Sequence, residues 1–139
     1  MIKSGLAALA ALMVLGATQA HALTPADIVA RHTAAVAKSD VDALMADYAD
    51  DAVVLEAGKA IQGKPAIRAL LAGMFPAPKP GAAPTGAAAM KITRSWQEGS
   101  VGFFTWELPT IRGTDEFLVR GDKIMVQAVF LTPVGTGKP

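Results

Sequence analysis

A period of two in the side chains of residues 90–131 restricts the fold of this chain more than any other feature. In the first part of this stretch, Met90, Ile92 and Trp96 share one side, and the residues between them are mostly polar. Such alternation is typical of half-buried strands, and short turns such as Gly121-Asp122 join strands into hairpins. We therefore expect four long antiparallel strands, at residues 90–97, 101–108, 111–120 and 123–131.

Two helices are expected before any strand. The first begins at residues 24–27, where Thr24 can cap the helix and a proline suits its first position, and it extends to about Lys38. His32 lies on its inward stripe among apolar residues. A second, shorter helix follows, and its apolar stripe ends at Tyr48.

A hairpin and a third helix complete the first half of the chain. Residues 52–56 and 59–62 can pair as short strands around an Ala-Gly turn. The third helix opens at residues 63–65, and Pro76 stops it. The segment 76–88 holds four prolines and no long apolar side chain, so we expect an exposed, extended connector. Too little chain follows it to build a second core, which argues against a linker between two domains.

This order of elements predicts an α+β fold in which the helices cover one face of an antiparallel sheet. A length of 139 residues allows one domain. We expect that domain to span residues 23–139.

Residues 1–22 have the pattern of a secretory signal peptide. Lys3 supplies the positive start, residues 6–16 form an apolar run, and Ala20-His21-Ala22 is a small-x-small cleavage site. The apolar run is too short to span a bilayer. We therefore expect cleavage after Ala22 and a periplasmic or secreted protein with no membrane contact afterwards. The alternative is an uncleaved membrane anchor.

Composition excludes several kinds of site. The chain has 13 basic and 12 acidic residues, and this near-neutral balance argues against a nucleic acid partner. It contains no cysteine, which excludes disulfides, thiolate metal sites and a cysteine nucleophile. Once the signal is removed, His32 is the only histidine, so we expect neither a metal site nor a cofactor.

Three motifs carry a resemblance to a known superfamily. They are Y-A-D-D-A-V-V at residues 48–54, G-K-P-x-I-R at residues 63–68 and D-E-F-L-V-R-G-D-K-I-x-x-Q at residues 115–127. Together with the order of elements, they resemble the nuclear transport factor 2-like superfamily over about residues 26–132. Ketosteroid isomerases and SnoaL-like proteins are branches of it. The resemblance implies a cone-shaped, strongly curved antiparallel sheet wrapped around N-terminal helices, as in cystatin-like folds. It also implies an apolar pocket in the cone and a homodimer formed through the back of the sheet.

The resemblance to ketosteroid isomerases implies three site residues. Glu56 takes the position of the proton-shuttling carboxylate, and His32 that of a tyrosine that donates to the substrate oxygen. Asp115 takes the position of a protonated aspartate, the second donor. This chain departs from the family pattern at two of these positions, because the family has Asp where Glu56 stands and Tyr where His32 stands.

The physical chemistry of these residue types fits that assignment. Glu56 lies among apolar neighbours, where desolvation raises the pKa of a carboxyl group toward the range of a general base. A neutral His32 and a protonated Asp115 could both donate hydrogen bonds to a carbonyl oxygen and stabilise an enolate. Such a constellation suits proton abstraction beside a carbonyl group on an apolar substrate.

Each residue also has a structural interpretation. Glu56 could lie in solvent at a strand end beside Lys59. His32 could be a core histidine bonded to a backbone carbonyl or to Tyr48. Asp115 follows Gly113-Thr114, where Asp is ordinary turn chemistry. The adjacent acids at positions 50 and 51 are interpreted as helix-end and turn residues rather than ligands.

Aromatic side chains are expected to form much of the core and to line part of the pocket. The candidate ligand-binding residues are Tyr48, Trp106, Phe117 and Phe130. Two functions remain open. One is an exported isomerase, cyclase or dehydratase that acts on a small hydrophobic carbonyl compound. The other is a non-catalytic module that binds a small apolar ligand or dimerises through its sheet.

Overall fold

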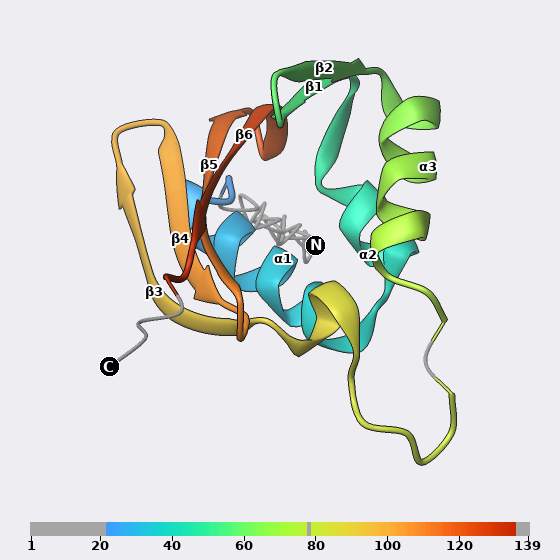
Figure 1. Cartoon of the computed structure of the whole chain (residues 1–139). Coiled ribbons are helices and arrows are strands. Elements are labelled where there is room, and N and C mark those ends of the chain that lie inside the picture. Colours follow the sequence, from blue (N-terminus) through green and yellow to red (C-terminus); the bar gives the residue numbers. More distant parts are fainter. Residues whose placement is uncertain (1–21, 78, 136–139) are drawn as a thin grey trace, which may run out of the picture.

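Helix α1 (Pro25–Lys38) lies against the concave side of the sheet in the computed structural model, which describes residues 22–77 and 79–135 (Figure 1). Its first turn is closed by a capping box, in which Thr24 Oγ1 accepts from the backbone N–H of Asp27 and the Asp27 carboxylate accepts from the backbone N–H of Thr24. Ser39 ends the helix in the left-handed conformation. The predicted bounds of this helix are confirmed.

The second helix is shorter than predicted. Helix α2 (Val41–Ala46) is capped by Asp40, and strand β1 (Tyr48–Glu56) begins two residues after the helix ends. Tyr48 is therefore the first residue of a strand and not the end of a helical stripe. The backbone N–H of Ile124 donates to the carbonyl oxygen of Asp47 at 2.8 Å, and this pairing with the last strand draws the chain out of the helix.

The strand prediction for residues 52–56 was also too short, because β1 includes both Asp50 and Asp51. These residues are not in a turn. They lie exposed in an irregular part of the strand between Tyr48 and Val53, where the pairing shifts register. Lys64 Nζ lies 3.2 Å from the Asp50 carboxylate and forms an ion pair with it.

The hairpin and the third helix follow the prediction closely. Strand β2 (Lys59–Gln62) pairs with β1 around Ala57 and Gly58, which both have positive φ. Helix α3 (Lys64–Met74) buries Ile67 and Leu71. The connector after it is mostly exposed, but its last part forms a short 3-10 helix, η1 (Gly86–Ala89), which packs on α1 and which the sequence did not predict (Figure 1).

Four antiparallel strands form the meander, as predicted. They are β3 (Lys91–Glu98), β4 (Val101–Glu107), β5 (Ile111–Arg120) and β6 (Lys123–Pro133). One expected face is wrong. A register shift between Ile92 and Arg94 sends Trp96 to the side opposite Ile92, where its ring stacks on Phe103 with centroids 4.9 Å apart.

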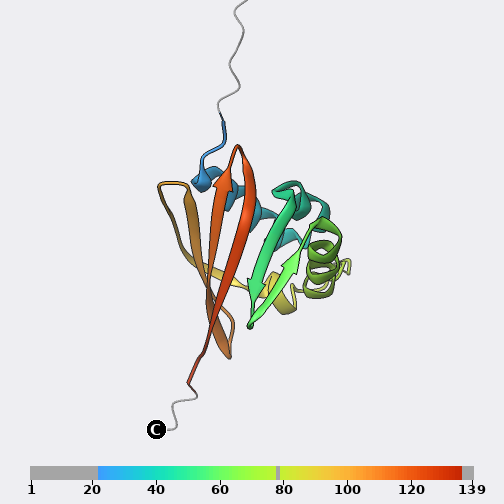
Figure 2. The ribbon, with the colours of Figure 1, turned by 90° about the horizontal axis from the view of Figure 1, so that it is seen from above.

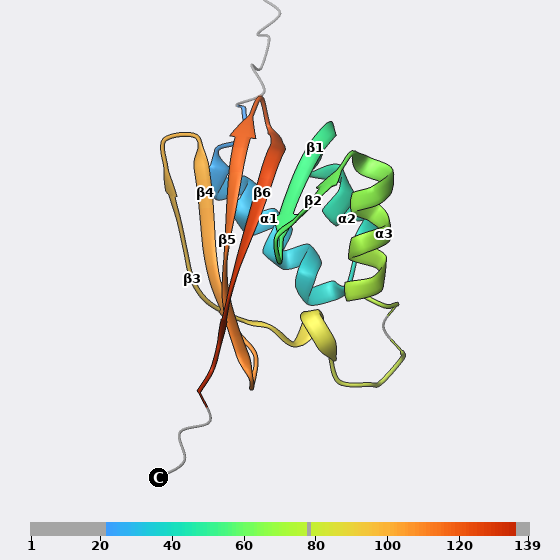
Figure 3. The same cartoon turned by 45° about the horizontal axis from the view of Figure 1, so that its top comes forward.

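The six strands form one curved, mixed sheet in the order β2-β1-β6-β5-β4-β3 (Figures 2 and 3). All neighbouring pairs are antiparallel except β1 and β6, which run parallel, so the sheet is not the purely antiparallel one expected. Helix α1 packs on β3, β4 and β5, whereas α3 packs on β1 and β2. The result is an α+β fold whose sheet curves around α1.

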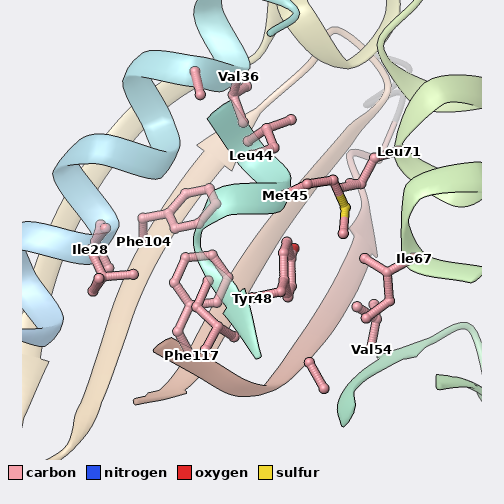
Figure 4. Close-up of a cluster of buried hydrophobic side chains, with 14 of the residues drawn as sticks. Ile28, Val36, Leu44, Met45, Tyr48, Val54, Ile67, Leu71, Phe104 and Phe117 are labelled. Carbon is pink, nitrogen blue, oxygen red and sulfur yellow. The ribbon is translucent and has the colours of Figure 1, made fainter. Parts of the chain in front are cut away.

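The core fills the space between the helices and the concave face. Figure 4 shows the rings of Phe104 and Phe117 close together near Ile28 of α1, with the ring of Tyr48 on the side toward Val54 and Ile67. Gly102 allows α1 to pack close against β4, because a Cβ atom at residue 102 would lie 2.7 Å from Cγ2 of Val29 in α1.

The expected signal peptide lies outside the described residues apart from Ala22. Among the residues that the structure describes, no helix is both long enough and apolar enough to span a membrane.

Candidate functional site

A cavity of about 240 Å³ opens between the concave face of the sheet and helices α1, α3 and η1. Most of its wall is apolar. The apolar lining consists of Val36, Val54, Leu70, Leu71, Met74, Phe75, Gly86, Ala87, Met90, Phe104, Trp106, Leu108, Ile111, Val129 and Leu131. A mainly apolar hollow with few polar groups is typical of a small-molecule site.

Four polar side chains line the same cavity, and three of them are the predicted site residues. His32 comes from α1, Glu56 from the end of β1 and Asp115 from β5. Gln127 of β6 is the fourth. The fold thus brings together residues that are far apart in the sequence.

Asp115 is buried, and both of its carboxyl oxygens accept hydrogen bonds. Trp106 Nε1 donates to Oδ2 at 2.6 Å, and Gln127 Nε2 donates to Oδ1 at 2.5 Å. Burial raises the pKa of Asp115 above its usual value, although these two bonds and the charge of His32 lower it and the charge of Glu56 raises it further. Asp115 is neither in a turn nor in solvent.

Gln127 connects Asp115 to Tyr48. The Tyr48 hydroxyl donates to Gln127 Oε1, while Gln127 Nε2 donates to Asp115, so both ends of the Gln127 amide are hydrogen-bonded. Burial, followed by the charges of Asp115 and Asp47, raises the pKa of Tyr48, which keeps its hydroxyl protonated as a donor. The chain of bonds holds β1, β5 and β6 together at the floor of the cavity.

His32 is bonded neither to a backbone carbonyl nor to Tyr48. Its Nδ1 lies 3.1 Å from Oδ2 of Asp47, a fully buried residue whose Oδ1 accepts from Arg31 Nε at 2.6 Å. The imidazole also meets the rings of Phe117 and Tyr48 edge-on, with centroids 4.8 and 5.8 Å away. These contacts fix the ring in place.

Glu56 lies at the mouth of the cavity. It is half-buried, and it borders both the cavity and a groove outside the β1–β6 junction. Lys59 lies opposite Glu56 at the strand end, but Glu56 is half-buried and not fully in solvent. Among the described residues, its carboxylate has no hydrogen bond or ion pair. A half-buried carboxylate without a partner is free to meet a ligand.

The four aromatic residues expected to bind ligand lie in different places. Trp106 lines the cavity. Tyr48 and Phe117 are fully buried and support it from behind rather than line it. Phe130 is 56% exposed on the opposite side of the sheet, because the neighbouring residues of β6, at positions 129 and 131, take the inward places. The wall itself contains Phe104, an aromatic residue that was not among the four candidates.

Sequence reasoning missed Gln127 and Asp47. Gln127 interrupts the apolar run of the last strand, and a polar residue in such a run could have indicated an inward role. Asp47 closes the C-terminal end of α2. A carboxylate there opposes the helix dipole, and this is the only local signal of a special role.

No group of three or more metal-binding side chains occurs within residues 22–77 and 79–135. Of the polar groups of the cavity, Asp115 and Gln127 are bonded to each other, and His32 is bonded to Asp47.

The comparisons with known proteins agree with this architecture. The model of the SnoaL-like domain family matches residues 29–127 of the chain. Among curated proteins, none matches the sequence.

Several solved structures share the fold. An NTF2-like protein of unknown function from Burkholderia xenovorans is 18% identical, with a TM-score of 0.63 over 82% of this chain and 87% of that one. A candidate polyketide cyclase from Sinorhizobium meliloti is 22% identical, with a TM-score of 0.58 over 75% and 94% of the two chains. A SnoaL-like candidate polyketide cyclase from Shewanella putrefaciens is 11% identical, with a TM-score of 0.59 over 77% and 88%.

Proposed function

Because the chain belongs to the SnoaL-like domain family, we propose that it binds a small hydrophobic carbonyl compound in its cavity and transfers a proton on it. The observation that carries this proposal is the convergence of His32, Glu56 and Asp115 on one apolar cavity. The reaction class is that of an isomerase, a cyclase or a dehydratase.

The size of the cavity limits the ligand. A dry protein cavity of about 150 Å³ accepts benzene. The cavity here measures about 240 Å³, which suits a compound of one or two rings. Its apolar wall supplies most of the binding free energy, and the polar groups orient the carbonyl end.

The chemistry divides between two carboxyl groups. Glu56, as a carboxylate, takes a proton from the carbon beside the carbonyl group, and the electron pair moves onto the carbonyl oxygen. Asp115, whose raised pKa favours the protonated form, donates a hydrogen bond to that oxygen and stabilises the enolate. Glu56 then returns the proton to another carbon. Alternatively, the enolate attacks a second carbonyl group of the same molecule, and Glu56 returns the proton to the alkoxide that this attack forms.

The second outcome would be a cyclisation. The two candidate polyketide cyclases among the structural neighbours share the fold of this chain. Ring closure of this kind begins with the same proton abstraction as an isomerisation, so Glu56 and Asp115 serve either reaction.

A binding module without catalysis is the second candidate function, and one observation favours it. Both oxygens of Asp115 already accept hydrogen bonds from Trp106 and Gln127. A carboxyl group satisfied in this way serves the structure of the cavity without any reaction.

We also infer that the chain is exported through residues 1–22 and dimerises through the convex face of its sheet. The basic start, apolar run and small-x-small site support export. Mass spectrometry of the periplasmic and secreted fractions tests it, because cleavage leaves a chain that begins at Leu23.

The test of the proposed reaction compares wild type with Glu56→Gln on a β,γ-unsaturated cyclic ketone, followed by the absorbance of the conjugated product. We expect the variant to lose about 10²- to 10⁴-fold in rate, the usual contribution of a general base. Its unfolding free energy should change by less than about 0.5 kcal/mol, since the side chain has no partner to lose.

Glu107→Gln is the matched control, because Glu107 is exposed at the end of β4 and does not line the cavity. Its rate should equal that of wild type. Background rates in all three proteins, together with tight binding of a saturated ketone, would leave the binding module as the function. Turnover that survives Glu56→Gln would remove Glu56 from the mechanism.

A further inference from the structure

The buried carboxylate of Asp47 faces two side chains of α1. Its Oδ1 accepts from the guanidinium Nε of Arg31 at 2.6 Å, and its Oδ2 lies 3.1 Å from Nδ1 of His32. A guanidinium only donates hydrogen bonds, and an ionised carboxylate only accepts them. The proton between Asp47 and His32 therefore belongs to Nδ1 of the imidazole.

This bond decides what the other nitrogen of His32 offers. In its neutral form the imidazole carries one proton, so a neutral ring protonated at Nδ1 has a lone pair at Nε2, whereas the charged ring that lowers the pKa of Asp115 donates from both nitrogens. Among the described residues, Nε2 of His32 has no hydrogen-bond partner. In the same part of the chain, every side-chain nitrogen or oxygen that is fully buried does have a partner, so Nε2 cannot be fully buried. Nε2 is thus not enclosed by protein, and it opens into the cavity that His32 lines.

We propose that Asp47 is a positioning residue that holds His32 as a proton acceptor toward the cavity, so that the site takes a ligand presenting a hydroxyl group to Nε2. This narrows the ligand of the proposed function to an apolar carbonyl compound that also carries a hydroxyl or enol group. It also reverses the role expected of His32, which was that of a donor to the carbonyl oxygen.

The role of Asp47 is distinct from that of a simple ion pair with Arg31. The rings of Phe117 and Tyr48 pack edge-on against the imidazole and prevent it from turning away. The carboxylate then selects the tautomer, and Arg31 holds the carboxylate in the required orientation. Arg31 and Asp47 thus together make Nε2 of His32 a hydrogen-bond acceptor.

The first test is a long-range ¹H–¹⁵N correlation spectrum of the full chain in mildly alkaline buffer, with His32→Gln to assign the signals. We expect a protonated Nδ1 and an unprotonated Nε2. A protonated Nε2 overturns the proposal, whatever any ligand does.

The second test uses Asp47→Asn, which keeps the shape of the side chain. Arg31 can only donate, so it retains the amide oxygen, and the amide nitrogen then donates to Nδ1 of His32. The imidazole proton must move to Nε2, a change of tautomer like that caused by the Asp-to-Asn substitution in a catalytic triad. The spectrum should show the reversed pattern.

Ligand preference should reverse with the tautomer. Naphthol, which donates from its hydroxyl group, should bind wild type about 3- to 10-fold more tightly than its methyl ether, the range of one hydrogen bond. In Asp47→Asn the ether should bind at least as tightly as naphthol. Asp42→Asn is the control, since Asp42 pairs with Arg68 at 2.7 Å on the exposed surface and should keep the wild-type spectrum and preference.

The outcomes separate this proposal from the proposed function, on which its ligand part rests. Equal affinity of wild type for naphthol and its ether would contradict the proposal that the ligand presents a hydroxyl group to Nε2. If neither compound binds but Nδ1 is protonated, the binding cavity of the proposed function fails and the positioning role of Asp47 stands. If Asp47→Asn does not fold, the wild-type spectrum and the wild-type preference still decide.

Discussion

Asp115 is subject to opposed influences at the floor of the cavity. Burial raises its pKa, whereas the hydrogen bonds from Trp106 and Gln127 and the charge of His32 lower it. The net effect is a raised pKa, so the folded state holds the proton more tightly than the unfolded state does. A group of this kind makes stability depend on pH.

The sign of that dependence follows from the direction of the shift. The contribution of Asp115 is most favourable below the ordinary pKa of an aspartate, about 3.9. It decreases as the pH rises toward the raised pKa of the folded state, and above that the buried charge destabilises the protein. Asp115→Asn should remove this decrease and gain stability relative to wild type as the pH rises.

Urea unfolding midpoints from acidic to neutral pH measure this gain. Gln127 can turn its amide to accept from an asparagine at position 115, and its amide nitrogen then donates to the Tyr48 oxygen, so the bond between Tyr48 and Gln127 reverses its direction. Asp51→Asn, at an exposed position of β1, should follow the wild-type curve. Parallel curves for wild type and Asp115→Asn would show that Asp115 does not titrate as its burial requires.

The sequence placed the polar residues of the cavity better than it placed their partners. His32, Glu56 and Asp115 stand where a plain core would be apolar, and that mismatch is visible in the chain itself. Their bonds are not, because Tyr48 and Gln127 are 79 residues apart and Asp47 lies beyond the end of α1. Pairing of this kind depends on how separate elements pack.

At the scale of the element, Gly113 of β5 sets the position of the Trp106 ring. A Cβ atom at residue 113 would lie 2.4 Å from Cζ2 of that ring and 3.1 Å from the carbonyl oxygen of Phe130. The ring therefore lies directly over the glycine. This position brings Nε1 of Trp106 to Asp115.

Gly113→Ala should displace Trp106 and break its bond to Asp115. We expect a loss of about 1–3 kcal/mol in unfolding free energy from overpacking, together with a shift in tryptophan fluorescence. Gly73→Ala in α3 is the control, because a Cβ atom there meets nothing within 4 Å. It should stabilise the helix by up to about 1 kcal/mol. Equal stability of Gly113→Ala and wild type would mean that the ring adapts freely.

The elements that could be predicted have their signals in adjacent residues. The start of α1, the end of α3 and the turn at Gly121-Asp122 depend on caps, prolines and residues that accept positive φ. The early start of β1 and the bulge near Ile92 depend on pairing with distant strands. Alternation alone therefore assigned Trp96 to the wrong face.

At the scale of the molecule, the convex face of the sheet carries large exposed apolar side chains. Phe130 is 56% exposed and Leu55 is 43% exposed, and the stacked pair of Trp96 and Phe103 lies on the same face. Aromatic residues are enriched at protein interfaces. This distribution supports the proposed homodimer.

Phe130→Glu should shift the protein from dimer to monomer in sedimentation velocity, because it puts a charge into an apolar contact. Ala82→Glu in the exposed connector changes the net charge equally and should leave the dimer intact. Both variants should keep the cavity, which neither residue lines. A wild-type chain that sediments as a monomer at every concentration would contradict the proposal.

The superfamily could be predicted from three short motifs, while the strand order could not be predicted in full. Hairpins follow from local turns, so the meander was predicted correctly. The parallel pairing of β1 with β6 joins residues 48–56 to residues 123–133, and no local pattern marks it. A wholly antiparallel sheet was expected for that reason.

The parallel pairing of β1 with β6 also determines how late in its synthesis the chain can complete its fold. The final strand supplies Gln127, Val129 and Leu131 to the cavity wall, and β1 has no neighbour on that side until β6 arrives. Contacts between such distant segments form late and slowly. A nascent chain therefore has no complete cavity until its C-terminal residues are free to pair, and a truncation that removes β6 opens the cavity wall and splits the sheet into β2-β1 and β5-β4-β3.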